Sequence, residues 1–136
     1  MKKRILIVED EADAVKLLEF YLQRAGFELT VATDGEQALQ LARASPPDLV
    51  LLDVMLPGLD GFAVCRLLRQ EPRTAAVPVL MTSALAMEFA QKQGLRLGAI
   101  EYLVKPFSPR ELLARIEQIL GRATEGIPAG TTVATR

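Results

Sequence analysis

The sequence contains no histidine and only one cysteine among its 136 residues. Without histidine the chain has no His–Ser or His–Cys catalytic pair, no histidine metal site and no residue that could become a phosphohistidine. A single cysteine excludes an internal disulfide framework and a cysteine-based zinc site. A metal site built from these side chains would therefore use oxygen ligands.

Neither sign of charge is in excess, because 16 basic and 17 acidic residues leave a formal net charge of -1. This balance offers no non-specific grip on a nucleic acid, so we expect no direct nucleic-acid binding by this chain. Long apolar runs are also missing. Residues 1–11 combine a basic start, a short apolar run and three acids, which is too brief for a signal peptide or a membrane span. We expect a cytoplasmic protein without membrane contact.

Short apolar runs alternate along the chain with longer amphipathic ones, which indicates strands followed by helices. Hydrophobic residues make up 50% of the sequence and charged residues 24%, a composition typical of one soluble domain of about 100–150 residues. The strands are predicted at Ile5–Val8, Glu28–Ala32, Leu49–Leu52, Val77–Met81 and Ile100–Val104.

Five helices are predicted from apolar spacing, capping residues and helix breakers. They run from about Ala14 to before Gly26, from Asp34 to before Pro46, from Asp60 to before Pro72, from Met87 to Leu97, and from Ser108 to Gly121. Asp60 is expected to be an N-cap, and Ser108 to Glu111 form a capping box with proline at the first helical position.

A helix after each strand forces parallel pairing with right-handed crossovers. The predicted fold is therefore an α/β, doubly wound, open parallel sheet with helices on both faces. Such sheets bind ligands beyond the carboxyl ends of their strands. Because the pattern stops after Gly121, we expect a domain over residues 1–121 and a flexible tail, or the start of a linker, over residues 122–136.

Charged residues follow three of the predicted strands at this edge of the sheet. Glu9 and Asp10 follow the first strand, Asp53 follows the third and Lys105 follows the fifth. Their charges sum to -2, and carboxylates placed so closely repel one another and raise at least one pKa unless a cation is present. A divalent cation would bring the sum to zero, and a hard ion such as Mg²⁺ suits oxygen ligands best.

Taken one at a time, these residues also have ordinary structural explanations. Glu9 and Asp10 could cap the first helix, and Asp53 could be a turn residue. Ser83, after the fourth strand, could be a helix cap, and Lys105 could be solvated. These explanations do not account for separate strand ends delivering complementary charges to one place.

Four segments together carry a resemblance to a known family. They are Ile7–Glu11 (IVEDE), Leu52–Gly61 (LDVMLPGLDG), Pro78–Ala84 (PVLMTSA) and Gly98–Phe107 (GAIEYLVKPF). In the order and spacing of these segments across residues 4–121, the sequence resembles the receiver domain of two-component response regulators. The resemblance implies a flavodoxin-like fold with five parallel strands in the order 2-1-3-4-5 and five helices, and a signalling switch rather than an enzyme.

The resemblance also implies a chemistry for the acidic residues. Asp53 would accept a phosphoryl group from a sensor histidine kinase or a phosphotransfer protein. Asp10 and Asp53 would ligate Mg²⁺ directly, with Mn²⁺ as a substitute. Glu9 would reach the ion through water, and the backbone carbonyl of Met55 would complete the protein ligands.

The same resemblance implies how the phosphoryl group would be held and sensed. Ser83 would hydrogen-bond the phosphoryl group, and Lys105 would pair with it. Tyr102 would be an aromatic switch that turns inward as Ser83 moves, and the Lys105–Pro106 bond is expected to be cis. Such a domain catalyses only its own phosphorylation and slow dephosphorylation, and it controls a partner or an output domain.

The sequence departs from the common family pattern at two positions, and two further positions bear on the lifetime of the phosphoryl group. The acidic pair is Glu-Asp where many relatives have Asp-Asp, and the hydroxyl at residue 83 comes from serine rather than the more usual threonine. The positions two residues after Asp53 and Ser83 tune the phosphoryl lifetime in the family. Here they are Met55 and Leu85, which are apolar and cannot orient an attacking water, so we predict slow self-dephosphorylation.

A possible self-association surface rests on weaker signals. Some family members dimerise through the fourth helix, fifth strand and fifth helix with charged pairs, and Glu101, Glu111 and Arg115 stand at matching positions. The basic position on the fourth helix is blurred, with Gln91 beside Lys92. A homodimer through this face and an ordinary solvated face both stay open, because exposed ion pairs contribute only about 0–1 kcal/mol each.

Three other functions fit this sequence less well. A binding module that phosphate does not switch normally lacks one of the acids, the acceptor aspartate or the lysine, and all are present here. A phosphatase with an aspartate nucleophile would need a second aspartate where Met55 stands. A flavodoxin-like electron carrier would need a phosphate-binding loop after the first strand, where Glu9, Asp10 and Glu11 would repel phosphate.

Overall fold

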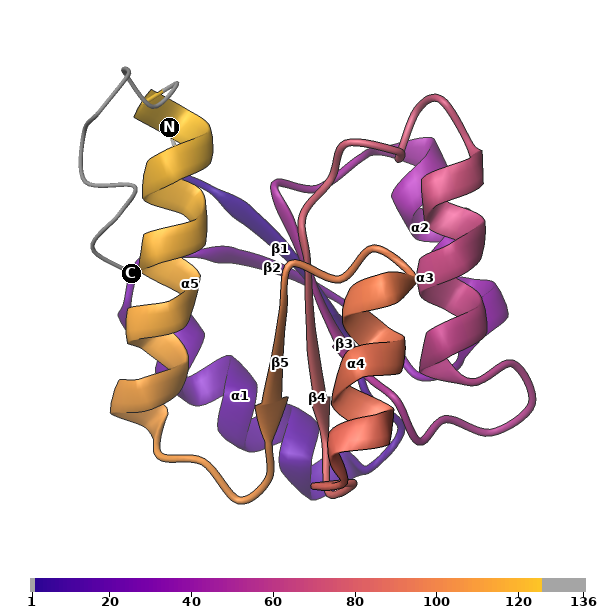
Figure 1. The fold of residues 1–136 in the computed structure, drawn as a ribbon. Helices are drawn as coiled ribbons and strands as arrows, with labels where there is room; N and C mark the ends of the chain where they lie inside the picture. The colour runs from indigo at the N-terminus through magenta and orange to yellow at the C-terminus, as the bar shows by residue number, and fades with distance from the viewer. Residues whose placement is uncertain (1, 126–136) are drawn as a thin grey trace.

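The computed structural model describes residues 2–125, in which strands and helices alternate (Figure 1). The elements are β1 (Arg4–Val8), α1 (Ala12–Arg24), β2 (Glu28–Ala32), α2 (Gly35–Ala44), β3 (Leu49–Asp53), α3 (Gly61–Gln70), β4 (Val79–Ser83), α4 (Glu88–Arg96), β5 (Glu101–Val104) and α5 (Pro109–Glu125). The predicted sequence of five strands, each followed by a helix, is confirmed.

The five strands form one parallel sheet in the order β2-β1-β3-β4-β5, which confirms the predicted topology. Helices α1 and α5 lie on one face of the sheet, and α2, α3 and α4 lie on the other (Figure 1). Val8 pairs with Leu52, and Asp53 pairs with Thr82. This register brings the residues that follow β1, β3, β4 and β5 to the same edge of the sheet.

Alternating side chains along the strands form two apolar layers, one on each face. The layer beneath α1 and α5 contains Ile5, Ile7, Leu49, Leu51, Leu80 and Leu103 with Leu22, Leu112, Ile116 and Ile119. The opposite layer contains Leu6, Val8, Val50, Leu52, Val79 and Met81 with Ala38, Ala42, Val64, Cys65 and Leu68. Every residue of β3 and β4 is buried, as expected for central strands covered on both faces. The strand ends that carry the candidate site are therefore held by packing on both sides.

Three helices begin with the capping chemistry indicated by the sequence. The side-chain oxygens of Asp34, Asp60 and Ser108 accept hydrogen bonds from the backbone N–H three residues later, at 2.8, 2.9 and 3.0 Å respectively. Each bond satisfies a donor that a helix N-terminus would otherwise leave free. The Lys105–Pro106 peptide bond is cis, as expected.

The fourth strand is shifted along the chain relative to the prediction. It spans Val79–Ser83 rather than Val77–Met81. Pro78 has no N–H to donate to a strand ladder, so the strand begins after it. At the other end the strand continues through two polar residues, Thr82 and Ser83, which are both buried.

Helix α5 is longer than predicted, because it continues past Gly121 to Glu125 and contains 17 residues. A glycine inside a helix costs only about 0.5–1 kcal/mol relative to alanine, so it need not end one. The rest of the predicted tail, residues 126–136, lies outside the described residues. No helix within residues 2–125 is long and apolar enough to cross a membrane.

Candidate functional site

The loop after β1 buries one acid and exposes the next. Glu9 is only 4% exposed, and its backbone N–H donates to the carbonyl of Ala32 at 3.0 Å. Its side-chain Oε2 accepts from the N–H of Glu11 at 3.2 Å, whereas Asp10 is exposed. The N-cap of α1 is Glu11, which makes no side-chain capping bond. The alternative that Glu9 and Asp10 cap this helix is therefore wrong.

Asp53 ends β3 with its carboxylate almost fully buried, at 5% exposure for the residue. Its Oδ1 accepts a hydrogen bond from the N–H of Met55 at 3.0 Å. Its Oδ2 lies 3.0 Å from the ammonium nitrogen of Lys105. Asp53 belongs to the strand itself and has ordered partners for both oxygens, so the interpretation as a simple turn residue does not hold.

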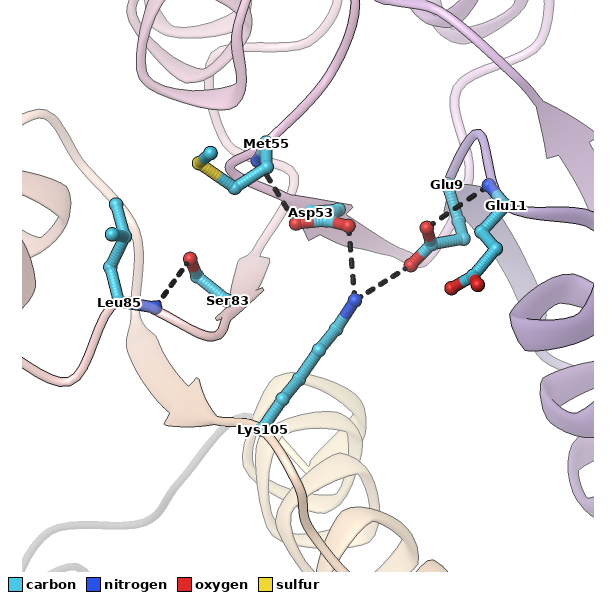
Figure 2. Close-up of polar contacts among 7 residues, drawn as sticks. All are labelled: Glu9, Glu11, Asp53, Met55, Ser83, Leu85 and Lys105. Atoms are coloured by element: carbon cyan, nitrogen blue, oxygen red, sulfur yellow. Dashed lines mark hydrogen bonds and ion pairs between the residues drawn. The ribbon is translucent and has the colours of Figure 1, made fainter.

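The ammonium group of Lys105 joins the two buried acids. Its Nζ lies 2.9 Å from Glu9 Oε1 and 3.0 Å from Asp53 Oδ2, and its side chain is 29% exposed. Figure 2 shows this side chain extending from the end of β5 to a point between the two carboxylates. Lys105 is thus paired within the site rather than solvated.

Burial and charge act in opposite directions on these groups. Burial alone would lower the pKa of Lys105, but the hydrogen bonds and charges of Glu9 and Asp53 outweigh it and raise that pKa. Burial raises the pKa of Glu9, and the nearby charge of Asp53 adds to this, while the hydrogen bond from Lys105 opposes it. Lys105 therefore stays positively charged at neutral pH, and its hydrogen bond does not fully offset the cost of burying an ionised Glu9.

Glu9, Asp10 and Asp53 each offer one carboxylate oxygen within 4.8 Å of the others. Together with Lys105 they carry the predicted charge of -2. Three hard oxygen donors at this separation could hold a divalent cation such as Mg²⁺, which prefers carboxylates and water. The cluster therefore fits the metal that the sequence suggests, on the chemistry of its donors.

Gly61 brings the start of α3 against the end of β3. Its N–H donates to the carbonyl of Val54 at 2.9 Å. A Cβ on Gly61 would lie 2.4 Å from the carbonyl oxygen of Asp53 and 2.7 Å from Val54 Cα, so no side chain fits there. Sequence reasoning missed this positioning role because nothing local distinguishes a glycine required by packing from one required by a turn.

The backbone of Leu85 connects Ser83 with Tyr102. The Ser83 side chain is fully buried, and its Oγ accepts from the N–H of Leu85 at 3.0 Å (Figure 2). The Tyr102 hydroxyl donates to the carbonyl of the same residue at 3.0 Å. Helix α4 has Met87 as its N-cap, so Ser83 is not a helix cap. A movement of either hydroxyl would act on the same short loop.

Known proteins resemble this chain in both sequence and fold. The family model described as response regulator receiver domain matches residues 5–117, which is most of the chain. The chain belongs to the receiver domain family. Its fold, its acidic cluster and the order of its four matching segments thus have a common explanation in two-component signalling.

Relatives and solved structures agree with this assignment. The receiver domain is 48% identical over 129 residues to the alkaline phosphatase synthesis transcriptional regulatory protein PhoP of Bacillus subtilis, covering 95% of this chain and 53% of that protein. The Francisella response regulator 1452 receiver domain superimposes with a TM-score of 0.84 at 31% identity, covering 90% of this chain and 99% of that one.

A third similarity concerns a structure with a metal. The receiver domain of sensor histidine kinase PA1611 from Pseudomonas aeruginosa PAO1, described with a magnesium ion coordinated in its active-site cleft, gives a TM-score of 0.83 at 31% identity. The superimposed region covers 89% of the present chain and 99% of the PA1611 receiver domain. The present chain spans about half the length of the transcriptional regulators it matches, 53% for PhoP.

The charged residues predicted for self-association pair within this receiver domain. The guanidinium of Arg115 contacts the carboxylate of Glu101, and its second nitrogen lies 3.8 Å from Glu111 Oε2. Glu101 is only 8% exposed. Several apolar side chains are exposed in or beside the neighbouring α4 and just before β5, namely Met87, Phe89, Leu95 and Ile100. Whether this face joins two copies stays a prediction.

Proposed function

We propose that this receiver domain accepts a phosphoryl group on Asp53 from a sensor histidine kinase or a phosphotransfer protein, in a reaction that depends on Mg²⁺. The supporting observation is the buried Asp53 carboxylate, held 3.0 Å from Lys105 and beside two further acids. An Asp53 oxygen attacks phosphorus and forms an O–P bond. The P–N bond to the donor imidazole breaks, and its electron pair leaves with the donor nitrogen.

Glu9, Asp10 and Asp53, with the backbone carbonyl of Met55, would hold the metal. The oxygen-only donor set favours Mg²⁺, with Mn²⁺ as a substitute. When bound, the ion would supply positive charge to the equatorial oxygens of the transferring group. The magnesium described in the PA1611 receiver domain supports this assignment, because that chain has the same fold.

The remaining roles belong to side chains already ordered around Asp53. Lys105 would keep its ammonium group near Asp53 and pair with a phosphoryl oxygen, exchanging one charge-assisted contact for another. Ser83 would turn its hydroxyl toward the phosphoryl group and release the N–H of Leu85. Tyr102 would respond, because its hydroxyl is bonded to the same residue. In this way a local charge change would bias a loop with two arrangements.

The phosphorylated state would persist because the side chains two residues after Asp53 and Ser83 are apolar. Met55, which is 58% exposed, lines an open pocket together with Leu56, Asp60, Phe62 and Leu85. The side chains of Met55 and Leu85 have no polar group that could hold a water for in-line attack on the acyl phosphate. The domain would therefore act as a switch that retains its modification, rather than as a phosphatase.

The proposal extends to partners and place. The domain would meet its kinase in the cytoplasm and control an output domain or a separate partner, as the transcriptional regulators among its relatives suggest. A homodimer through α4, β5 and α5 would be one form of that output. Glu101, Glu111 and Arg115 would then rearrange from contacts within one chain to contacts between chains.

Incubation with acetyl phosphate and Mg²⁺, followed by intact mass measurement, tests the proposal. We expect a gain of one phosphoryl group in the wild type and in Asp60→Asn, because asparagine also caps α3. We expect no gain in Asp53→Asn or in the presence of EDTA. Phosphoryl uptake by Asp53→Asn, or uptake that ignores EDTA, would exclude Asp53 or the metal respectively.

A further inference from the structure

Gly94 lies inside α4 on the side that faces the sheet, and it is buried. A Cβ at this position would lie 2.7 Å from the sulfur of Met81 and 3.1 Å from Cδ2 of Tyr102. The first distance is shorter than real Cβ contacts allow, and the second is tighter than ordinary van der Waals contact. The absence of a side chain at residue 94 therefore creates the space in which both neighbouring side chains lie.

The two neighbours differ in their freedom to move. Met81 is fully buried in the apolar layer of β4, at 0% exposure, and close packing leaves it little room. Tyr102 packs against the same layer but is only half-buried, so its ring has a path toward solvent. A methyl group at residue 94 would press the Met81 sulfur toward the neighbouring Tyr102, and outward movement of the Tyr102 ring would relieve both contacts.

Outward movement of the Tyr102 ring would break the hydrogen bond made by its hydroxyl group. The Tyr102 hydroxyl reaches the carbonyl of Leu85 at 3.0 Å only while the ring lies against α4. The N–H of Leu85 in turn donates to Ser83 Oγ. The packing of α4 at Gly94 is therefore connected, through Tyr102 and Leu85, with the hydroxyl group of Ser83.

We propose that Gly94 is a positioning residue for Tyr102: by lacking a side chain it admits the ring to its inner position, defined here by the hydrogen bond to Leu85. Glycine weakens the interior of a helix, so its presence in the middle of α4 has a cost that this packing role explains. Insofar as the position of Tyr102 reports the state of Ser83, the inference rests on the proposed function.

The sequence offers a direct optical test, because it contains two tyrosines and no tryptophan. In a Tyr21→Phe background, fluorescence arises from Tyr102, and acrylamide quenching measures its accessibility. We expect Gly94→Ala to raise the quenching constant of the unphosphorylated full chain, because overpacking should lower the ratio of inner to outer Tyr102 roughly tenfold.

A matched control lies in α5. Gly121→Ala makes the same replacement inside a helix, but a Cβ there meets no atom within 4 Å. We expect its quenching constant to equal that of the Tyr21→Phe parent. Equal quenching in Gly94→Ala and Gly121→Ala would overturn the proposal.

A rescue variant separates positioning from a general loss of packing. Met81→Val removes the sulfur that a Cβ at residue 94 would strike. In the Gly94→Ala, Met81→Val double variant we therefore expect quenching to return toward the parent value. A quenching constant that stays high in the double variant would overturn the proposal. This comparison with the Tyr21→Phe parent applies even if Gly94→Ala alone is too unstable to measure.

The outcome is independent of phosphoryl uptake. The quenching measurement uses unphosphorylated protein, whereas intact mass after acetyl phosphate treatment tests Asp53. Uptake with unchanged quenching would leave the proposed function standing and remove the role of Gly94. Changed quenching without uptake would leave Gly94 as the residue that positions Tyr102 and remove the phosphorylation model.

Discussion

Replacing Lys105 by methionine removes the cation that bridges Glu9 and Asp53 while keeping much of the side-chain volume. The lost contacts are 2.9 and 3.0 Å long, and the two acidic side chains are only 5% and 6% exposed. Removing one partner from a buried ion pair costs about 3–5 kcal/mol. Because the Lys105 side chain is 29% exposed, we expect a smaller loss of about 2 kcal/mol in the metal-free protein.

Thermal unfolding in EDTA measures this loss. For a domain of this size 1 kcal/mol shifts Tm by roughly 3–5 °C, so Lys105→Met should lower Tm by about 6–10 °C. Lys92→Met is the matched control. The Lys92 side chain is 66% exposed and pairs with Glu88 one helical turn away, so its replacement should cost less than about 0.5 kcal/mol.

Saturating Mg²⁺ should narrow the difference between Lys105→Met and the wild type. Without the ammonium group the site carries three negative charges, so it should bind a divalent cation more tightly. Binding to the folded state adds about 2.7 kcal/mol of stability at a concentration one hundred times Kd. The rise in Tm on adding Mg²⁺ should therefore be larger for Lys105→Met than for the wild type or for Lys92→Met.

The pH dependence has a definite sign on each side. The pKa of Lys105 is raised above 10.5 in the folded state, so its stabilisation is complete below pH 10.5 and is lost as pH rises through the folded pKa. The pKa of Glu9 is raised above 4.5, mainly by burial, so the metal-free protein gains stability as pH falls through that pKa toward 4.5. A neutral Glu9 needs no counter-ion, and the deficit of Lys105→Met should shrink there.

The reasoning would be refuted by equal Tm values for Lys105→Met and Lys92→Met in EDTA at neutral pH. That result would mean that the bridging ammonium contributes nothing, and the electrostatic description of the site would be wrong. A deficit that does not respond to Mg²⁺ would retain the ion pairs but remove the cation site.

Two further predictions concern lifetime and association. Phosphorylated protein in Mg²⁺ should lose its phosphoryl group over minutes or longer, as measured by intact mass. Met55→Asn should shorten this time, because its amide can hydrogen-bond an attacking water. Loss from the wild type within seconds would contradict the role given to Met55 and Leu85. Arg115→Glu should weaken phosphorylation-dependent association in sedimentation experiments, while Arg110→Glu, an exposed position on the same helix, should not; unchanged association in Arg115→Glu would remove the homodimer through this face.

The strands and the edge that carries the site could be predicted because their signals are local or topological. The apolar run Leu49–Leu52 indicates a central strand by itself, and parallel pairing then places Asp53 beside the ends of the other strands. The same logic brought Glu9, Asp10 and Lys105 together without coordinates. The sequence pattern could not predict which neighbouring group each charged side chain would contact. Local rules allowed Glu9 to cap α1, but the ammonium of Lys105, 96 residues away, determined its contact.

The roles of glycines and backbone groups were out of reach for a different reason. Gly61 and Gly94 are required by atoms of other elements at 2.4–3.1 Å, and such distances depend on how helices settle on the sheet. Leu85 joins Ser83 to Tyr102 through its N–H and carbonyl, which every non-proline residue possesses. A sequence identifies side-chain chemistry, whereas these connections are made by a missing side chain or by the backbone.

Burying Glu9 costs the fold stability, and this cost makes the site sensitive to a change of charge at Asp53. Burial raises the pKa of Glu9, and the charge of Asp53 adds to this, although Lys105 and the N–H of Glu11 oppose it, so an ionised Glu9 destabilises the metal-free fold. A ligand shifts a conformational equilibrium only by the difference in its affinity for the two states. A group that brings a cation to Asp53, or adds negative charge there, changes the electrostatic environment of Glu9 and Lys105. Because Lys105 contacts both Glu9 and Asp53, a change of charge at Asp53 also alters the interactions at the ends of β1 and β5.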